Sequence, residues 1–552
     1  MPSDWTSFKK ELEEKGYLQT QKGGFFFRWS LKSLTPGGSL VRLALWTSIM
    51  TAGALSFMLA ALFLITQRVF LPQILIYYFP LLVIASLAVF ALLTVVLRLH
   101  PFRTPTRAAF AFAFLAAAGG AWALISPFHF YLPVKAQPFL LGAETVLLAL
   151  LLFPPLRVLA FISFREPNLS RYRLGGWIAL GLGLVLGAAG LFFFLPSRAA
   201  DEGKRFPLSP LEKPLAVFAV DALEAKSIPD NFPVLNDILA NGRRVDLHVD
   251  GRPSPPVFWT QAATGFPPEV NGIVSLQAWH LPFIERALYP LPMAGLFSTL
   301  GIAKVSLAST AERKKPAFWE LASWAGRPSA CVNWWSSWEP KDPGVQVVSN
   351  LFLIQKLRGL TGTQCQPADL CHREYSVNPA EAEGARWDEL AREALAGTGQ
   401  GRALAAAYFP GLDVSLFQAR ALTLAQGLDL SKDLTPSLKA IESGLADFKA
   451  RGYRILLISF SGRQEKPWAW AAFYPVEKAS GQINGATALD LLPTILHTLD
   501  MPVAQNLPGR VLPTPWIIAN EQVIPGYPDL SAPRTAAGRT PIEELRSLGY
   551  LQ

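Results

Sequence analysis

The feature that most constrains this chain is a series of long apolar segments in its N-terminal part. Each segment is close to the roughly 20 residues that a helix needs to cross the hydrocarbon core of a bilayer. Because backbone groups cannot stay unpaired in lipid, we expect each segment to form a transmembrane helix. The segments follow one another, so a cleaved signal peptide does not account for them. They lie at residues 43–65, 74–97, 107–127, 139–161 and 174–195.

The orientation of these helices follows from the basic residues beside them. Arg and Lys are concentrated before the first segment, between the second and third, and between the fourth and fifth. The two alternate connections carry Arg68 and Lys135. The positive-inside rule therefore places the N-terminus in the cytoplasm, and an odd number of spans places everything after about residue 200 outside.

The same patterns divide the chain into four parts. The first precedes the apolar segments and shows the spacing of an amphipathic helix, either at the membrane interface or packed on the protein. The third is polar and contains prolines, as linkers do. The parts are 1–42, a cytoplasmic segment with an amphipathic helix; 43–195, a membrane domain of five helices; 196–213, a linker; and 214–552, an extracytoplasmic domain.

The C-terminal part has the pattern of an α/β domain. The runs "PLAVFAVDAL" (214–223) and "RILLISFSG" (454–462) are continuously apolar, as strands covered on both faces are. Helical patterns occupy 232–242 and 488–500. Asp221 ends the first strand, and ligands of open α/β sheets gather at the carboxyl ends of strands. We therefore expect Asp221 at a metal or ligand site.

Composition excludes two classes of function. The net charge is +9, but the basic residues lie beside the apolar segments and form no stripe with interleaved aromatic residues, so we expect no nucleic-acid partner. The three cysteines contain no CxxC pair, so a structural zinc site is not expected. The spacing of Cys365 and Cys371 allows a disulfide in an oxidising compartment without requiring one.

Several motifs in order give the C-terminal part a family resemblance. It resembles the alkaline phosphatase superfamily, nearest to the type I phosphodiesterase/nucleotide pyrophosphatase (sulfatase-like) branch. That resemblance implies a central, mainly parallel sheet with helices on both faces. Five spans before such a domain are similar to the phosphoethanolamine transferases of bacterial envelopes, which implies the bacterial inner membrane with the C-terminal domain in the periplasm. The motifs are "VDAL" at 220–223, "SPPVFWTQAATGFPPEVNGI" at 254–273, "PAFWELASWAGRPSACVNWWSSWEP" at 316–340, "GLDVSLF" at 411–417 and "DLLPTILHTLDMPV" at 490–503.

Family members use a nucleophile and two metal ions, and this chain departs from that pattern. Asp221 matches the first family ligand. The nucleophile position falls on Pro255, which leaves the adjacent Ser254 as a candidate displaced nucleophile. The Asp-x-x-x-His motif falls on Asp413 and Phe417, so the acid is kept and the imidazole is lost.

The remaining family ligands are also replaced. The Ser-Asp-His-Gly motif falls on Ser459, Phe460, Ser461 and Gly462. The two carboxylates that remain, Asp221 and Asp413, are too few ligands for a pair of zinc ions. They would hold at most one hard divalent cation, together with water molecules. Aromatic side chains in place of charged ligands fill a metal cavity with apolar volume and remove the need to pair buried charge.

Three tryptophans form a further candidate site. The resemblance places Trp334, Trp335 and Trp338 near the rim of the site, where they would stack on a sugar or a lipid headgroup. Packing in the core or at the rim is the alternative, and we favour it.

The sequence therefore predicts a non-catalytic envelope protein without a cofactor. Its expected partners are the lipid bilayer and an envelope glycan, a lipid headgroup or a protein. The alternative is an active phosphodiesterase, sulfatase or phosphoethanolamine-type transferase that uses Ser254 with one divalent cation at Asp221 and Asp413. A third hypothesis assigns the function to the membrane domain.

Overall fold

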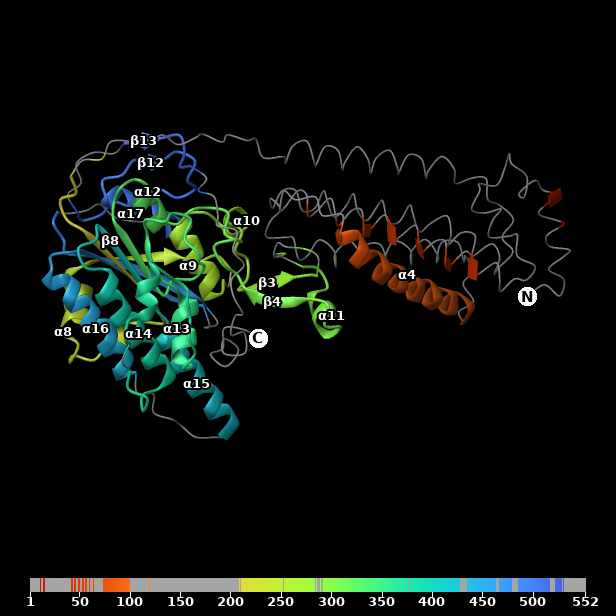
Figure 1. Cartoon of the computed structure of the whole chain (residues 1–552), viewed down its shortest axis with the longest axis horizontal. Helices are drawn as coiled ribbons and strands as arrows, with labels where there is room; N and C mark the ends of the chain where they lie inside the picture. Colours follow the sequence, from red (N-terminus) through yellow and green to blue (C-terminus); the bar gives the residue numbers. More distant parts are fainter. Residues whose placement is uncertain are drawn as a thin grey trace. The chain divides into compact units, whose positions relative to one another are not determined.

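A computed structural model gives the arrangement of the chain, which divides into two compact units (Figure 1). The N-terminal unit comprises Met1–Ser197 with Pro290–Met293, and the C-terminal unit comprises Arg198–Tyr289 and Ala294–Gln552. The structure describes residues 73–99, 210–251, 253–282, 291–375, 377–426, 434–462, 466–478, 485–516 and 522–528, with isolated positions elsewhere.

In the N-terminal unit, the longest described element is helix α4 (Gln73–Leu99), at the second predicted span. Within the described part of the chain, no helix is both long and apolar enough to cross a membrane. The predicted spans at 107–127, 139–161 and 174–195 lie outside the described residues apart from Gly119, and so does most of 1–65. The five-span domain therefore stays a prediction.

The C-terminal unit is built on a mixed, mostly parallel sheet, which confirms the predicted α/β class. Its described strands follow the order β11-β2-β10-β9-β1-β8-β5-β6-β7. Strand β1 (Leu215–Asp221) lies between β9 (Arg454–Ser461) and β8 (Leu404–Phe409) and is parallel to both. All three strands are buried at every position. The others are β2 (Arg243–His248), β5 (Ser329–Val332), β6 (Gln346–Val348), β7 (Cys365–Gln366), β10 (Trp468–Tyr474) and β11 (Ala486–Thr487).

Helices cover both faces of this sheet (Figure 1). On one side, α14 packs against α13, α15 and α16, and α16 also packs against α8. On the other side, α17 packs against α9 and α12. The helices are α8 (Pro233–Asn241), α9 (Pro255–Thr264), α12 (Phe318–Trp324), α13 (Asn350–Leu357), α14 (Glu383–Thr398), α15 (Gly411–Gln426), α16 (Thr435–Ala450) and α17 (Leu491–Thr498).

Smaller elements complete the described part of this unit. The strands β3 and β4 form a two-stranded antiparallel ribbon, and the short helix α11 lies between them in the sequence. The strands β12 and β13, late in the sequence, form a two-stranded parallel pair. The elements are α10 (Pro268–Asn271), β3 (Gln277–His280), α11 (Ala294–Thr299), β4 (Lys304–Leu307), β12 (Val503–Ala504) and β13 (Val523–Ile524), with short 3-10 helices at Ala225–Ser227, Ala368–His372 and Ala488–Asp490.

Candidate functional site

The carboxyl end of β1 brings together side chains from distant parts of the chain. Asp221 is the last residue of β1 and lies beside Phe460 of β9 in the parallel register. On the other side of β1, the strand β8 brings in Tyr408. Helix α9 contributes Trp259, which contacts both Asp221 and Tyr408. We call these four residues, together with Phe258, the Asp221 site.

The Asp221 carboxylate is buried and accepts hydrogen bonds at both oxygens. Only 1 % of the residue is exposed. The indole Nε1 of Trp259 donates to Oδ1 at 2.7 Å. The phenol of Tyr408 donates to Oδ2. A buried carboxylate is costly unless donors compensate for lost hydration, and here an indole and a phenol provide that compensation.

Aromatic rings pack around this carboxylate. The rings of Phe258 and Phe460 are stacked, with centroids 4.0 Å apart and planes 7° from parallel. The ring of Trp259 lies 5.7 Å from that of Tyr408 and 6.3 Å from that of Phe460. Phe460, at the position where the resemblance implies a metal ligand, therefore contributes apolar volume beside Asp221 in the sheet register.

These residues do not fit the metal pair that the resemblance implies. A ligand carboxylate must offer its lone pairs to the ion. Each oxygen of Asp221 already accepts one hydrogen bond from a buried protein donor, which leaves it one further lone pair. Among the described residues, no group of three or more His, Cys, Asp and Glu side chains comes together in a way that could hold a metal. Asp413 lies buried in the first turn of α15, and a single cation held with Asp221 stays a hypothesis.

Ser254 lies at the start of α9, one residue before the helix. It is exposed, and its side chain does not cap the helix. Its carbonyl oxygen accepts from the backbone amides of Val257 and Phe258, each at 3.0 Å. Pro255 opens the helix because its fixed φ suits the first turn and its missing N–H is not needed there. A serine hydroxyl is a weak nucleophile until a base or a metal activates it.

The structure places two of the three candidate tryptophans in the core. Trp334 and Trp335 are 0 % and 1 % exposed, and Trp338 is half-buried. The indole of Trp334 donates to the carbonyl oxygen of Trp259 at 3.2 Å. The ring of Trp335 lies 5.9 Å from that of Tyr408. Trp334 and Trp335 therefore expose no ring face on which a ligand could stack, and both indoles pack within the core beside the Asp221 site.

The structure pairs two of the cysteines and leaves the third unpaired. A disulfide joins Cys365 of β7 to Cys371, with their Cα atoms 5.5 Å apart, and closes a short loop. Cys331 in β5 is buried and free, and burial raises the pKa of its thiol well above the ordinary value. A thiol in that state is a packing group and not a nucleophile.

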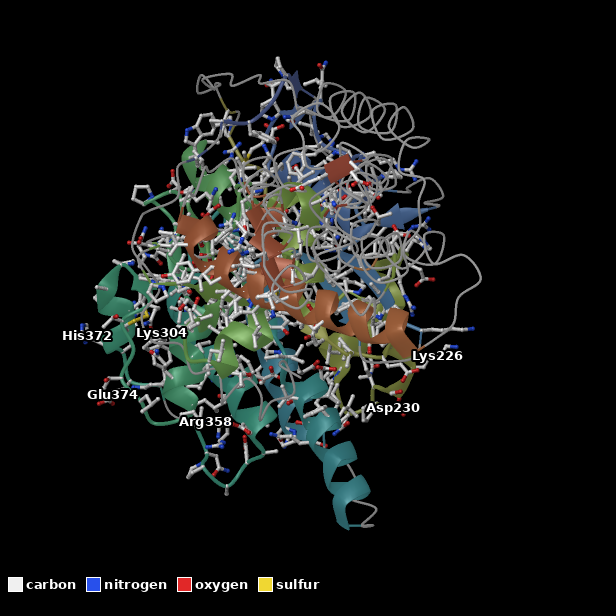
Figure 2. All side chains as sticks on the ribbon, turned by 90° about the vertical axis from the view of Figure 1, so that its right-hand side faces the viewer. Lys226, Asp230, Lys304, Arg358, His372 and Glu374 are labelled. Carbon is white, nitrogen blue, oxygen red and sulfur yellow. A yellow bond between two sulfur atoms is a disulfide. The ribbon has the colours of Figure 1, made fainter. Side chains whose placement is uncertain are left out.

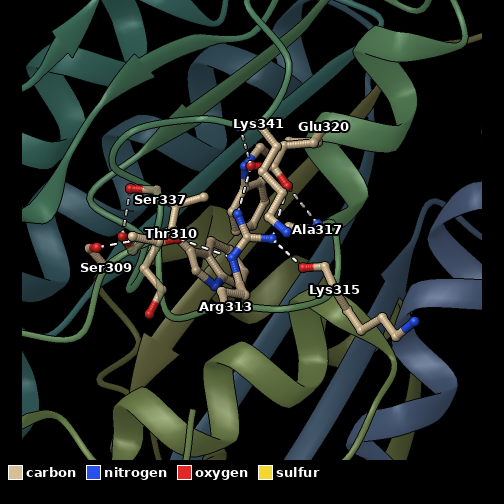
Figure 3. A network of polar contacts seen from close by, with 12 residues as sticks. Ser309, Thr310, Arg313, Lys315, Ala317, Glu320, Ser337 and Lys341 are labelled. Atoms are coloured by element: carbon tan, nitrogen blue, oxygen red, sulfur yellow. Dashed lines mark hydrogen bonds and ion pairs between the residues drawn. The ribbon is translucent and has the colours of Figure 1, made fainter. Parts of the chain in front are cut away.

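Sequence reasoning missed a buried ion pair between Arg313 and Glu320 (Figure 3). The two side chains are 1 % and 0 % exposed. The guanidinium donates to the carboxylate twice, at 2.8 Å from Nη1 and 2.6 Å from Nη2. The carboxylate also accepts from the backbone amides of Ala317 and Lys341, each at 2.8 Å. Burial alone would raise the pKa of Glu320, but the charge and hydrogen bonds of Arg313 hold it below its ordinary value.

The same guanidinium connects two loops at the amino end of α12. Its Nε donates to the carbonyl oxygen of Ser336 at 3.2 Å, and its Nη1 donates to that of Lys315 at 2.7 Å. Thr310 also donates to the Ser336 carbonyl oxygen, at 2.8 Å. No spacing or motif in the sequence marks this network, because its members are ordinary charged and polar residues of loops.

A second buried carboxyl, Asp388 of α14, gives a prediction about pH. Burial raises its pKa to about 8, although the Gly411 amide that donates to Oδ1 at 2.8 Å acts in the opposite direction. An unfolded aspartate has a pKa of about 3.9, so the folded state keeps a proton that the unfolded state loses. The stability that Asp388 contributes is therefore fully present below about pH 4 and is lost as pH rises to about 8.

We expect Asp388→Asn to remove this part of the pH dependence. The amide oxygen can still accept from Gly411, and the side chain at position 388 then has no proton to lose. Denaturation midpoints measured at about pH 5 and about pH 9 should differ less in the variant than in the parent protein. Asp369 is exposed, so Asp369→Asn is the matched control. It should show the same difference between the two denaturation midpoints as the parent protein. If Asp388→Asn showed the same difference in midpoint as the parent protein, Asp388 would not be the source of this pH dependence.

Comparison with known proteins gives weak structural likenesses only. No protein-family model and no curated protein matches this chain. The fold is similar to a phosphonoacetate hydrolase from Sinorhizobium meliloti, at 15% identity and a TM-score of 0.31, covering 47% of this chain and 58% of that one. It is also similar to a murine ectonucleotide pyrophosphatase/phosphodiesterase, at 13% identity and a TM-score of 0.26, covering 45% and 57%.

A third solved structure, in complex with its substrate D-glucosamine-2-N,6-O-disulfate, is 13% identical with a TM-score of 0.28 and covers 57% of this chain and 81% of that one. These neighbours are members of the alkaline phosphatase superfamily. This chain spans less than two thirds of the first two of them. Likeness at this level establishes neither family membership nor activity.

Proposed function

We propose that this chain is a non-catalytic, membrane-anchored binding protein of the cell envelope. Its C-terminal domain would keep an alkaline-phosphatase-like scaffold with the centre of the former active site closed. The observation that carries the proposal is the Asp221 carboxylate, which accepts hydrogen bonds from Trp259 and Tyr408, with the stacked rings of Phe258 and Phe460 packed against Trp259.

The energetic cost of placing a cation at Asp221 supports the proposal that the former metal site is closed. A cation at Asp221 would have to enter between packed aromatic rings and bind a carboxylate whose oxygens each already accept a hydrogen bond from a buried donor. If it displaced either donor, that donor would be left without a partner at a cost of about 1–3 kcal/mol. The rings around the carboxylate would also have to move, and a packed core resists such shifts.

The anchor and the location of the protein are part of the same proposal. The five apolar segments and the charge bias of their flanks support a cytoplasmic N-terminus and a periplasmic C-terminal domain at a bacterial inner membrane. The disulfide between Cys365 and Cys371 suits an oxidising compartment. The ligand would be an envelope glycan, a lipid headgroup or a protein.

Turnover assays test the non-catalytic assignment. The full chain should hydrolyse neither bis-p-nitrophenyl phosphate nor p-nitrophenyl sulfate above background with zinc, manganese, magnesium or calcium added. A closed metal centre gives no activated nucleophile, so the exposed Ser254 stays unreactive. Ser254→Ala is the matched control, because it removes the one hydroxyl that the alternative enzyme would use. Metal-dependent turnover that is lost in Ser254→Ala would establish the alternative phosphodiesterase, sulfatase or transferase.

A further inference from the structure

A cleft lies at the same edge of the sheet as the Asp221 site but beyond strand β9. Its volume is about 530 Å³. Strands β2 and β10 line it on one side, and the segment that follows β1 lines it on the other. This volume falls in the range of small-ligand sites, about 300–1,000 Å³. The lining residues that the argument uses are Glu224, Lys226, Arg244, Asp246, His248 and Trp468.

The antiparallel pairing of β2 and β10 builds one wall of this cleft. Alternate residues of a strand share a face, so Arg244, Asp246 and His248 lie on the same side of β2. Trp470 of β10 pairs with Asp246 in the register. The guanidinium of Arg244 lies 5.3 Å from the centre of the Trp470 ring and donates to Asp246 Oδ1 at 3.0 Å. These two contacts place the Arg244 guanidinium over the face of the Trp470 ring.

The polar groups around the cleft include both donors and acceptors. Lys226 extends outward from the segment after β1 (Figure 2). Glu224, on the same segment, accepts from the Ser227 hydroxyl at 3.1 Å. His248 lies 3.1 Å from a carboxylate oxygen of Asp250 and is exposed. A hydroxyl-rich ligand finds partners for its own donors and acceptors on such a wall.

Trp468 gives the cleft an aromatic surface. It is half-buried, unlike Trp470, which is 2 % exposed and covered by Arg244. An indole face packs against flat apolar surface while its N–H remains available for a hydrogen bond. The charged wall disfavours an aliphatic ligand. Its two carboxylates, Glu224 and Asp246, are balanced by Lys226 and Arg244, so the wall has no excess positive charge that would select a strongly anionic ligand.

We propose that this cleft binds an oligosaccharide. A pyranose ring has a C–H face for the indole of Trp468 and hydroxyl groups for the polar wall of Arg244, Asp246 and Glu224. The assignment rests on the proposed binding function and names the class of its ligand. The ligand would then bind at strands β2 and β10, at the same edge of the sheet as the closed Asp221 site.

Calorimetric titration of the full chain with cellotetraose, chitotetraose, maltotetraose and mannotetraose tests the proposal. We expect at least one of these probes to bind. Trp468→Ala should weaken that binding about tenfold or more, as truncation of a central aromatic contact does, and Trp468→Phe should recover part of it. Arg244→Ala should also weaken it. Lys304→Ala, a surface lysine of β4 (Figure 2), is the matched control and should bind as the parent does.

Three outcomes of these titrations would overturn the proposal. In the first, none of the four tetrasaccharides binds; in the second, Trp468→Ala binds the sugar as tightly as the parent does. In the third, AMP binds at this cleft in an Arg244-dependent way while the sugars do not. Circular dichroism checks that each variant is folded. Failure of the non-catalytic function is a separate result: metal-dependent turnover with sugar binding still dependent on Trp468 would leave the cleft assignment standing.

Discussion

Arg313→Met is expected to destabilise the C-terminal unit by about 3–5 kcal/mol, the usual cost of removing one partner of a buried ion pair. Glu320 would remain with 0 % exposure and lose both guanidinium hydrogen bonds. The backbone amides of Ala317 and Lys341 would still donate to it, but they carry no full charge. Hydrogen exchange of the amides of β1 and β8 measures the change, because these core strands open only when the unit unfolds.

A double variant separates the cost of the orphaned charge from the value of the pair. Arg313→Met with Glu320→Met should recover much of the loss, since well-packed apolar residues replace buried ion pairs at little cost. The exposed pair of Arg244 and Asp246 gives no comparable reference for this measurement, because solvent screens it. If Arg313→Met alone changed stability by less than about 1 kcal/mol, the buried network would not be the structural element we describe.

Asp221→Asn is expected to lower the free energy of unfolding by about 2–4 kcal/mol. A hydrogen bond to a charged group is worth about 1.5–3 kcal/mol, and in the variant the hydrogen bonds from Trp259 and Tyr408 no longer have a charged acceptor. The amide oxygen can accept from Trp259 or from Tyr408. The amide nitrogen then faces the other donor at close range. Thermal denaturation of the full chain, with hydrogen exchange of β1, measures the loss.

This stability effect distinguishes a structural carboxylate from a functional one. Ligands of a metal site are held against mutual repulsion, and replacing one often leaves an enzyme as stable or more stable when the metal is absent. Ser254→Ala is the surface control and should lie within about 0.5 kcal/mol of the parent. A stable Asp221→Asn variant in metal-free buffer would contradict the structural role of Asp221.

Much of the sheet was predictable because its strands are continuously apolar. The run at 214–223 became β1 and the run at 454–462 became β9, as parallel strands covered on both faces require. The helix predicted at 232–242 is α8. The predicted helix at 488–500 begins as a 3-10 turn and continues as α17.

The partners of Asp221 were not predictable from local pattern. Its position at a strand end marked it as a site residue, and the aromatic at position 460 indicated a filled cavity. Tyr408, however, is 187 residues away in the sequence, and its role depends on β8 lying beside β1. Strand order decides that contact, and an apolar run does not specify its neighbours in a parallel sheet.

Metal content of the purified full chain, with its denaturation temperature, tests the central claim most directly. The protein is exchanged into zinc, manganese, magnesium or calcium, washed and analysed for elements. The closed Asp221 site predicts well below one ion per chain and the same denaturation temperature with each metal as with a chelator. A retained ion that raises this temperature through binding to the folded state, and is lost in Asp221→Asn, would show that the site is open to metal and would contradict our account.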